Sequence, residues 1–373
     1  MSRILSVVWY KVLPPLFGGQ KGIAEFNEHL ANHHSLTCLC ASHNEPEYAS
    51  YTTIPTLPQT RLQVISPIAW KQLFDAIRTY EITHLLLEHC YYGLAGIFFK
   101  KWLGVKLVVH AHNIESLRFR QEGRWWWPFL WFLENITLRQ ADLVMFKTQR
   151  DQKFATTNWG VRIENTMIVP FGLNRNDVPT VAEKESARKS IQTRHQFRDE
   201  EKILLFAGTL DYEPNALALT GIVQKLIPLL SEMNGKKFRV LVCGRLMNPA
   251  YQYLKKLEHE DYTFAGLVQD IEQYMLAADV FINPVVEGGG IKVKTIEALA
   301  YNLPVVSFEQ GAEGIDMEVT GTKLHICEDG NWKQFAHKVC EATEPVEDIP
   351  LQFFSTYQWI SIVEQAALRI GSL

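Results

Sequence analysis

The sequence lacks several features that would place a protein in a well-marked class. Its six cysteines form no Cys-x-x-Cys pair, and most lie in apolar runs, as reduced core thiols do. No uncharged apolar run is as long as a membrane span. The short apolar N-terminus has no small-residue cleavage site and is typical of a first strand rather than a signal peptide. The net charge of −4 gives no support for nucleic-acid binding. These absences predict a cytoplasmic protein with no nucleic-acid partner.

Two motifs of nucleotide-dependent enzymes are also missing. The first glycine-rich loop, with Gly18, Gly19 and Gly22, lacks the G-x-G-x-x-G spacing and the strand-end acid of a dinucleotide site, which disfavours a nicotinamide cofactor. This loop is equally consistent with a flexible turn and with backbone N–H groups that contact a phosphate or sugar. The chain contains no Asp-x-Asp, so a diphosphate bound without Mg²⁺ would need protein cations and helix N-termini.

Apolar strands alternate with helical patterns throughout the chain. Its 373 residues, 47% of them hydrophobic, suffice for two domains with full cores. Near-continuous apolar strands separated by helices predict parallel sheets covered on both faces. The predicted strands are Ile4–Trp9, Leu36–Cys40, Arg61–Ile65, Thr83–Leu87, Lys106–His110, Leu143–Phe146 and Thr166–Val169 in the first half, and Ile203–Ala207, Phe238–Cys243, Tyr262–Phe264, Val280–Asn283 and Pro304–Ser307 in the second.

The two halves are separated by a polar, apolar-poor stretch at residues 174–202, which has the composition of a connector or a surface helix. We therefore expect one doubly wound domain at residues 1–172 and another at residues 173–352. A helical apolar pattern within residues 353–373 predicts a last helix that crosses back onto the first domain. Two such domains would face each other across a central cleft, because ligands bind outside the carboxyl ends of parallel strands.

The most informative stretch follows the predicted strand Val280–Asn283. Three consecutive glycines, Gly288 to Gly290, lead into a predicted helix that begins with Lys292 and Lys294 and continues to Glu297. Glycines let a backbone approach a ligand closely, and a helix N-terminus favours a phosphate. Lys294 and Glu297 are three residues apart and share a helix face, so a cation for a diphosphate lies beside a carboxylate for sugar hydroxyls. The alternative is an ordinary turn with solvated lysines, but the density of glycine and lysine favours a phosphate site.

A second candidate site follows the predicted strand Lys106–His110, in the segment V-V-H-A-H-N-I-E-S. His112 is placed to donate a hydrogen bond to a sugar hydroxyl or a leaving oxygen, and Glu115 to cap the following helix. A metal site through His110 and His112 stays open, although no third ligand has an obvious spacing.

Tryptophan is concentrated in the segment R-W-W-W-P-F-L-W-F-L-E at residues 124–134. The favoured interpretation is a helix packed on the sheet, because Leu130, Leu133 and Thr137 continue a helical face. Trp125 to Trp131 would otherwise form an acceptor-side surface or a peripheral membrane contact, since aromatic side chains favour both settings.

Taken together, these motifs resemble the retaining GT-B glycosyltransferases of group 1, family 4. G-G-Q-K-G is similar to the N-terminal loop of that family, and H-N-I-E to the segment whose histidine contacts the transferred sugar. V-P-F-G-L-N at residues 169–174 resembles the hinge between the domains. F-A-G-T-L-D-Y-E-P-N at residues 206–215 is similar to the opening strand and loop of the second domain. F-A-G-L-V-Q-D-I-E-Q-Y at residues 264–274 resembles the segment that cradles the base.

The resemblance implies a set of site residues. The implied catalytic residues are His112, Lys294 and Glu297, the last of which would hold the ribose hydroxyls. The implied donor-binding residues are Gly18, Gly19, Gly208, Gly266, Glu287, Gly288, Gly289, Gly290, Ile291 and Lys292. Two departures stand out: Gly289 occupies the position of the first acid in the family's Glu-x7-Glu pair, with Glu287 the nearest acid, and the loop after Phe206 carries no cation.

The sequence thus predicts an α/β protein of GT-B type, with two Rossmann-like domains. The expected activity is transfer of a sugar from a nucleoside diphosphate sugar to a glycan, lipid-linked or small-molecule acceptor. We expect retention of configuration, no metal, no cofactor besides the sugar-nucleotide co-substrate, and a cytoplasmic location that includes the inner face of the membrane. Two alternatives remain: a sugar-nucleotide epimerase of the same fold, and a non-catalytic GT-B subunit that binds a partner enzyme or a glycan.

Overall fold

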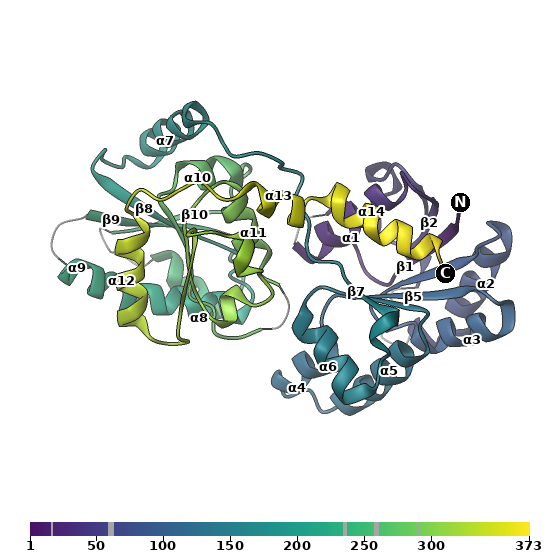
Figure 1. Ribbon diagram of the computed structural model, residues 1–373. Helices are drawn as coiled ribbons and strands as arrows, with labels where there is room; N and C mark the ends of the chain where they lie inside the picture. The colour runs from purple at the N-terminus through teal and green to yellow at the C-terminus, as the bar shows by residue number, and fades with distance from the viewer. Residues whose placement is uncertain (16–17, 59–62, 234–236, 257–260, 289–290) are drawn as a thin grey trace. The chain divides into compact units, whose positions relative to one another are not determined.

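The computed structural model describes residues 1–373 except 16–17, 59–62, 234–236, 257–260 and 289–290. The chain divides into two compact units, each a parallel sheet flanked by helices (Figure 1). The first unit comprises Met1–Asn174 and Tyr357–Leu373, and the second comprises Arg175–Gly288 and Lys292–Thr356. Two parallel-sheet α/β units of this kind are the architecture of a GT-B protein.

The first unit contains a seven-stranded sheet in the order β3-β2-β1-β4-β5-β6-β7. Its strands are β1 (Arg3–Val8), β2 (Ser35–Ala41), β3 (Thr52–Leu57), β4 (His84–Glu88), β5 (Lys106–Ala111), β6 (Leu143–Phe146) and β7 (Thr166–Ile168). Its helices are α1 (Gly18–Leu30), α2 (Pro67–Thr79), α3 (Gly93–Leu103), α4 (Glu115–Gln121), α5 (Trp127–Gln140), α6 (Gln149–Trp159) and α14 (Trp359–Gly371). Every residue of β4 and of β6 is buried, as expected for strands covered on both faces.

One predicted strand of this sheet is wrong. Gln63–Ile65, the described part of the expected strand Arg61–Ile65, is a single 3₁₀ turn, and the edge of the sheet is formed by β3 instead. The sequence of β3, T-T-I-P-T-L, is mostly half-buried and contains Pro55. Proline has no N–H to donate to a ladder, so it is tolerated at an edge but lowers the strand signal of the sequence.

The last helix of the chain completes the first unit. Helix α14 packs against α1 (Figure 1), and both helices bury apolar side chains, including Phe26 of α1 and Val363 of α14. Leu173 N donates to Tyr357 O at 2.6 Å, and Trp359 N donates to Leu173 O at 3.1 Å. These hydrogen bonds join the segment that leaves the first unit to the segment that returns to it.

The second unit contains a six-stranded sheet in the order β10-β9-β8-β11-β12-β13. Its strands are β8 (Glu201–Ala207), β9 (Lys237–Cys243), β10 (Tyr262–Gly266), β11 (Val280–Asn283), β12 (Val305–Phe308) and β13 (Leu324–Cys327). The helices are α7 (Val181–His195), α8 (Glu213–Gly221), α9 (Ile227–Glu232), α10 (Ile271–Ala277), α11 (Val293–Ala300), α12 (Trp332–Ala342) and α13 (Leu351–Tyr357). The edge strand β13 was not among the predicted strands.

The polar stretch between the halves contains a helix rather than an extended connector. Thr180 and Glu183 form a capping box at the start of α7, in which each side chain accepts a hydrogen bond from the other residue's backbone N–H. Only Ala187 and Ile191 of α7 are buried, which explains its apolar-poor sequence. The reversal of strand order between β8 and β11, like that between β1 and β4 in the first sheet, is the position at which such sheets bind ligands.

Candidate functional site

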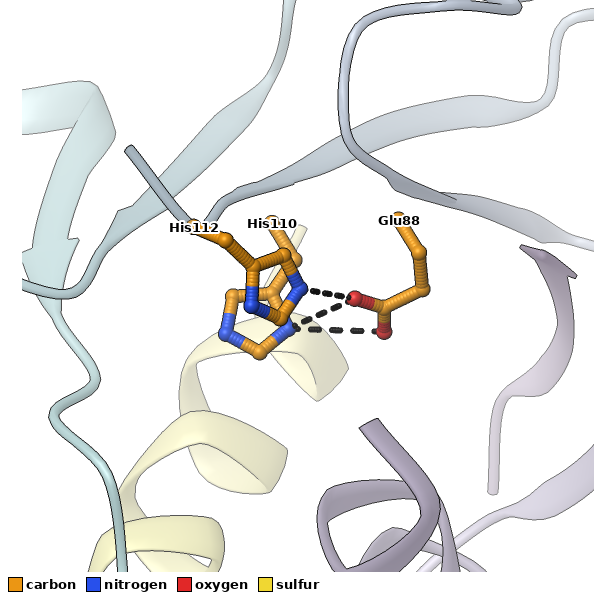
Figure 2. Close-up of side chains that lie close together, drawn as sticks. All are labelled: Glu88, His110 and His112. Carbon is orange, nitrogen blue, oxygen red and sulfur yellow. Dashed lines mark hydrogen bonds and ion pairs between the residues drawn. The ribbon is translucent and has the colours of Figure 1, made fainter. Parts of the chain in front are cut away.

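The first group of polar side chains lies at the carboxyl edge of the first sheet. Glu88 ends β4 and is paired in register with His110 of β5, and His112 follows β5 directly. Figure 2 shows the Glu88 carboxylate facing both rings: Oε2 lies 2.6 Å from Nε2 of His112 and 3.1 Å from Nδ1 of His110. The side chains of Glu88 and His110 are fully buried, whereas His112 keeps 12% of its side-chain surface exposed.

Burial dominates the electrostatics of this group. It lowers the pKa of His110 and of His112 to about 4 each, assisted by nearby cationic groups, so both rings are neutral near pH 7. Burial alone would raise the pKa of Glu88, but the two imidazoles hold it well below its ordinary value. Lys147, which follows β6, is also buried, and burial lowers the pKa of its ammonium to about 7 against the opposing attraction of Glu88.

Glu115 does not cap the helix that it begins, contrary to the sequence-based expectation. Oε1 of Glu134, on α5, accepts a hydrogen bond from Glu115 N at 2.8 Å, and Oε2 accepts one from Ser116 N at 3.0 Å. The carboxylate of Glu115 instead accepts from Tyr91 Oη at 2.9 Å and pairs with Arg118 at 2.5 Å. The start of α4 is thus capped by a neighbouring helix, which fixes the loop that carries His112.

Glu88, His110 and His112 are the one group among the described residues whose ligand atoms are arranged to hold a metal ion, since these atoms lie within 4.8 Å of one another. Two imidazoles and a carboxylate are a known ligand set for divalent transition metals. Glu88 is the third candidate ligand that the sequence did not reveal, because it lies on the neighbouring strand. The carboxylate already contacts both rings, and the buried ammonium of Lys147 disfavours a further cation here.

The second sheet presents glycines at its carboxyl edge. Gly208, Gly244 and Gly266 lie at or directly after the ends of β8, β9 and β10, and Gly288 lies in the loop between β11 and α11. Gly208 N donates to Cys243 O at 3.0 Å, and Gly244 N donates to Gly266 O at 2.7 Å. A Cβ on Gly244 would lie 1.9 Å from Gly208 O, and Gly288 has φ +94°, so both positions require glycine. The predicted Gly208, Gly266 and Gly288 therefore lie in the loops that follow the strands of this sheet.

Helix α11 begins beside this edge. Lys292 is its N-cap residue, and Lys292 Nζ donates to Gly288 O at 2.8 Å. Burial lowers the pKa of Lys292 to about 8 although Glu313 opposes the shift. Lys294 forms a hydrogen-bonded ion pair with Glu297 one turn along the helix. The structure thus brings both lysines and the acid to the start of α11.

The other predicted donor-binding residues are exposed, half-buried or outside the described residues. Glu287 is exposed and Ile291 is half-buried, and Gly289 and Gly290 lie outside the described residues. Gly18 and Gly19 form the first turn of α1. A Cβ on Gly19 would meet no atom within 4 Å among the described residues, so packing there does not require glycine.

Two polar residues at this edge were missed by the sequence analysis. Arg245, two residues after β9, pairs with Asp211 of the β8–α8 loop at 3.1 Å. This guanidinium lies against a loop that has no cation of its own. Gln310 Nε2 donates to Gly288 O at 3.2 Å. Both residues belong to loops after other strands, and only the strand order brings them here.

Comparisons with known proteins agree with this architecture. The family model described as Glycosyltransferase Family 4 matches residues 18–177, and the model described as Glycosyl transferases group 1 matches residues 201–344. The two matches fall on the two units of the structure. A search of curated protein sequences found no significant match.

Solved structures with a similar fold include proteins described as glycosyltransferases and a sucrose-phosphate synthase. HepE of Anabaena in complex with UDP is 16% identical, with a TM-score of 0.75 and full coverage of both chains. Sucrose-phosphate synthase of Thermosynechococcus elongatus is 15% identical, with a TM-score of 0.74 and 99% coverage of both chains. WaaG, described as a glycosyltransferase of lipopolysaccharide biosynthesis, is 15% identical, with a TM-score of 0.67 and coverage of 98% of this chain and 99% of WaaG.

Proposed function

The chain carries the two domains of a GT-B glycosyltransferase, and on this premise we propose that it transfers a sugar from a nucleoside diphosphate sugar with retention of configuration and without a metal. The donor class is supported by HepE, whose solved structures hold UDP and UDP-glucose. Metal independence is supported by the missing Asp-x-Asp and by the cations at α11.

The main support for the proposal is the start of α11, which lies beside the glycine-containing loops of the second sheet. The helix N-terminus, Lys292 and Lys294 supply positive charge for a diphosphate. Glu297 is held by Lys294 and would accept hydrogen bonds from ribose hydroxyls. The leaving group is the diphosphate, so the same cations stabilise the charge that develops on it in the transition state.

On the first unit, His112 would contact the transferred sugar. No side chain of this unit is proposed as a covalent nucleophile. The departing diphosphate would take the proton of the incoming hydroxyl, as the family resemblance implies. The acceptor would be a glycan, a lipid-linked molecule or a small molecule.

The test is the Lys294→Ala variant, with UDP binding measured by calorimetry and turnover measured with UDP-sugars. We expect the Kd for UDP to rise roughly 10- to 100-fold, because a charge-assisted contact to phosphate is lost. Lys338→Ala is the matched control, because Lys338 pairs with Glu341 at the same i,i+3 spacing at 2.6 Å on α12. Unchanged UDP affinity in Lys294→Ala would refute the phosphate role.

A thermal-shift screen with UDP, GDP, ADP, dTDP and CMP identifies the base, since a bound ligand raises the melting temperature with its occupancy. An epimerase would convert a nucleotide sugar with no acceptor present. Tight nucleotide binding with no turnover on any acceptor would favour the non-catalytic subunit.

We further propose that the first unit contacts an anionic membrane surface through α4, α5 and the turn between them. Leu130, Leu133 and Thr137 are buried as predicted, but Trp125, Phe129 and Phe132 are 87%, 62% and 61% exposed. Residues 115–140, which form α4, the turn and α5, carry four arginines against three glutamates, a net charge of +1 in a chain of net charge −4. Exposed aromatic rings beside cations are the composition of an interfacial contact.

Among the described residues, no helix is long and apolar enough to cross a membrane. Co-sedimentation with phosphatidylglycerol vesicles tests the contact. Binding should fall at least tenfold in the Trp125→Ser/Phe129→Ser double variant and should be weak to phosphatidylcholine vesicles. Phe98→Ser/Trp102→Ser, which removes two exposed rings of α3, is the control. Equal binding by both variants would contradict the proposed surface.

A further inference from the structure

The hydrogen bond between Glu88 and His112 determines which ring nitrogen of His112 carries a proton. An ionised carboxylate can only accept hydrogen bonds. Since Glu88 Oε2 lies 2.6 Å from His112 Nε2, Nε2 must be the protonated nitrogen. The ring is neutral near pH 7, so Nδ1 then carries a lone pair. Among the described residues, Glu88 is the hydrogen-bond partner of the His112 ring, and Nδ1 is left for a ligand.

His110 contacts Glu88, and Lys147 attracts it electrostatically. His110 Nδ1 donates to the same carboxylate at 3.1 Å, and its ring packs against Phe26 with a centroid distance of 4.7 Å. With 0% of its side chain exposed, His110 cannot reach a substrate. The buried ammonium of Lys147 attracts the anionic Glu88. The fully buried carboxylate thus contacts both rings and is attracted by a nearby ammonium, and of the two rings only that of His112 keeps an exposed surface.

We propose that Glu88 is a positioning residue that locks His112 in the Nε2–H tautomer, so that Nδ1 accepts a hydrogen bond from a hydroxyl of the transferred sugar. The inference rests on the proposed glycosyltransferase function for the identity of the ligand. From the sequence alone we expected His112 to donate a hydrogen bond to the sugar, whereas here its Nδ1 accepts one. A sugar hydroxyl that donates to Nδ1 gains electron density on its oxygen, which favours the positive charge that develops on the ring in glycosyl transfer.

The tautomer is measured directly by ¹⁵N NMR of the histidine-labelled full-length protein at pH 7. We expect a protonated Nε2 and an unprotonated Nδ1 for His112, identified by the loss of its signals in His112→Gln. A protonated Nδ1 would overturn the proposal. So would a stoichiometric shift of the His112 signals on addition of Zn²⁺ alone, because the three side chains would then be metal ligands.

Glu88→Gln tests the consequence for catalysis. Its amide can donate to Nε2 as well as accept from it, so the ring is no longer held in one tautomer. We expect kcat to fall about 10²-fold, the Nε2–H signature of His112 to be lost or mixed, and UDP affinity to stay within twofold. Glu88→Asp, which keeps the charge but withdraws it by one methylene, should keep the tautomer and recover part of kcat.

An unchanged kcat in Glu88→Gln, or a loss of UDP affinity equal to the loss of kcat, would refute the positioning role. If Glu88→Gln does not fold, the wild-type NMR spectrum and Glu88→Asp decide the question. The NMR measurement needs no substrate, so it separates the two ideas. The expected tautomer in a protein that turns over no nucleotide sugar would reject the proposed function and leave the Glu88–His112 interaction standing.

Discussion

Replacing Lys147 by methionine should stabilise the protein at neutral pH. Lys147 is 4% exposed, and its Nζ has no hydrogen-bond partner among the described residues. Methionine has a similar length and no charge, so it fills the same space without the desolvation penalty of a buried ammonium. The attraction of Glu88 offsets only part of this penalty, because the pKa of Lys147 still lies well below the ordinary value.

The magnitude follows from the pKa. A fall from 10.5 to about 7 corresponds to roughly 5 kcal/mol of unfavourable free energy for the charged form. The penalty is complete below about pH 7, where the folded and unfolded states are both protonated. Between pH 7 and 10.5 the unfolded chain binds the proton more tightly, so the stability of the wild type rises with pH. The advantage of Lys147→Met should therefore shrink across that interval.

Urea unfolding at pH 6.5 and at pH 10 measures this difference. We expect Lys147→Met to exceed the wild type by several kcal/mol, with about 5 kcal/mol as the upper limit, at pH 6.5 and by much less at pH 10. Lys101→Met is the control, because Lys101 is exposed on α3 and its replacement should change stability by no more than about 0.5 kcal/mol. A Lys147→Met variant that is less stable than the wild type at pH 6.5 would refute the reasoning.

Other predictions concern acid stability and packing. Stability should fall as pH drops from about 6.5 toward 4, because the unfolded chain binds protons that three buried histidines with pKa values of about 4 do not (His89, His110 and His112); a flat urea-unfolding profile between pH 7 and 5 would contradict this. Asn283→Ala should cost about 1–3 kcal/mol in the same assay, because Gly311 O loses the buried donor that lies 2.8 Å away. Gly93→Ala should lower the melting temperature, because its Cβ would lie 1.9 Å from Thr137 Oγ1 and overpack α3 against α5 at a cost of about 1–3 kcal/mol.

The sequence was most informative where burial is complete. Val280–Asn283 and Leu143–Phe146 have the predicted bounds, because a strand covered on both faces is an unbroken apolar run. Edge strands are less completely buried, so their apolar pattern is weaker. Thr52–Leu57 is half-buried and contains a proline, and Leu324–Cys327 has two half-buried residues in its middle, one of them His325, so neither produced a signal strong enough to predict a strand.

The site was predictable where its residues are neighbours in sequence. Lys294 and Glu297 share one helix turn, and their pairing follows from helix geometry alone. Glu88 and Arg245 were missed, because each contacts a residue in the loop after a different strand. Only the strand order and register bring these residues together. In the Trp125–Trp131 segment and the helix that it begins, the predicted buried face is confirmed, and the other face is exposed.

The packing of α14 on α1 has a consequence for the synthesis of the chain. The first unit needs residues from both ends of the sequence, whereas all of the second unit lies between them. During translation, the N-terminal segment therefore leaves the ribosome before α14 has been made. Until then, apolar side chains of α1 such as Phe26 are not covered by that helix. The second unit can complete its sheet earlier. A premature stop between α13 and α14 would leave the second unit complete and expose the apolar face of α1 in the first unit, which favours aggregation.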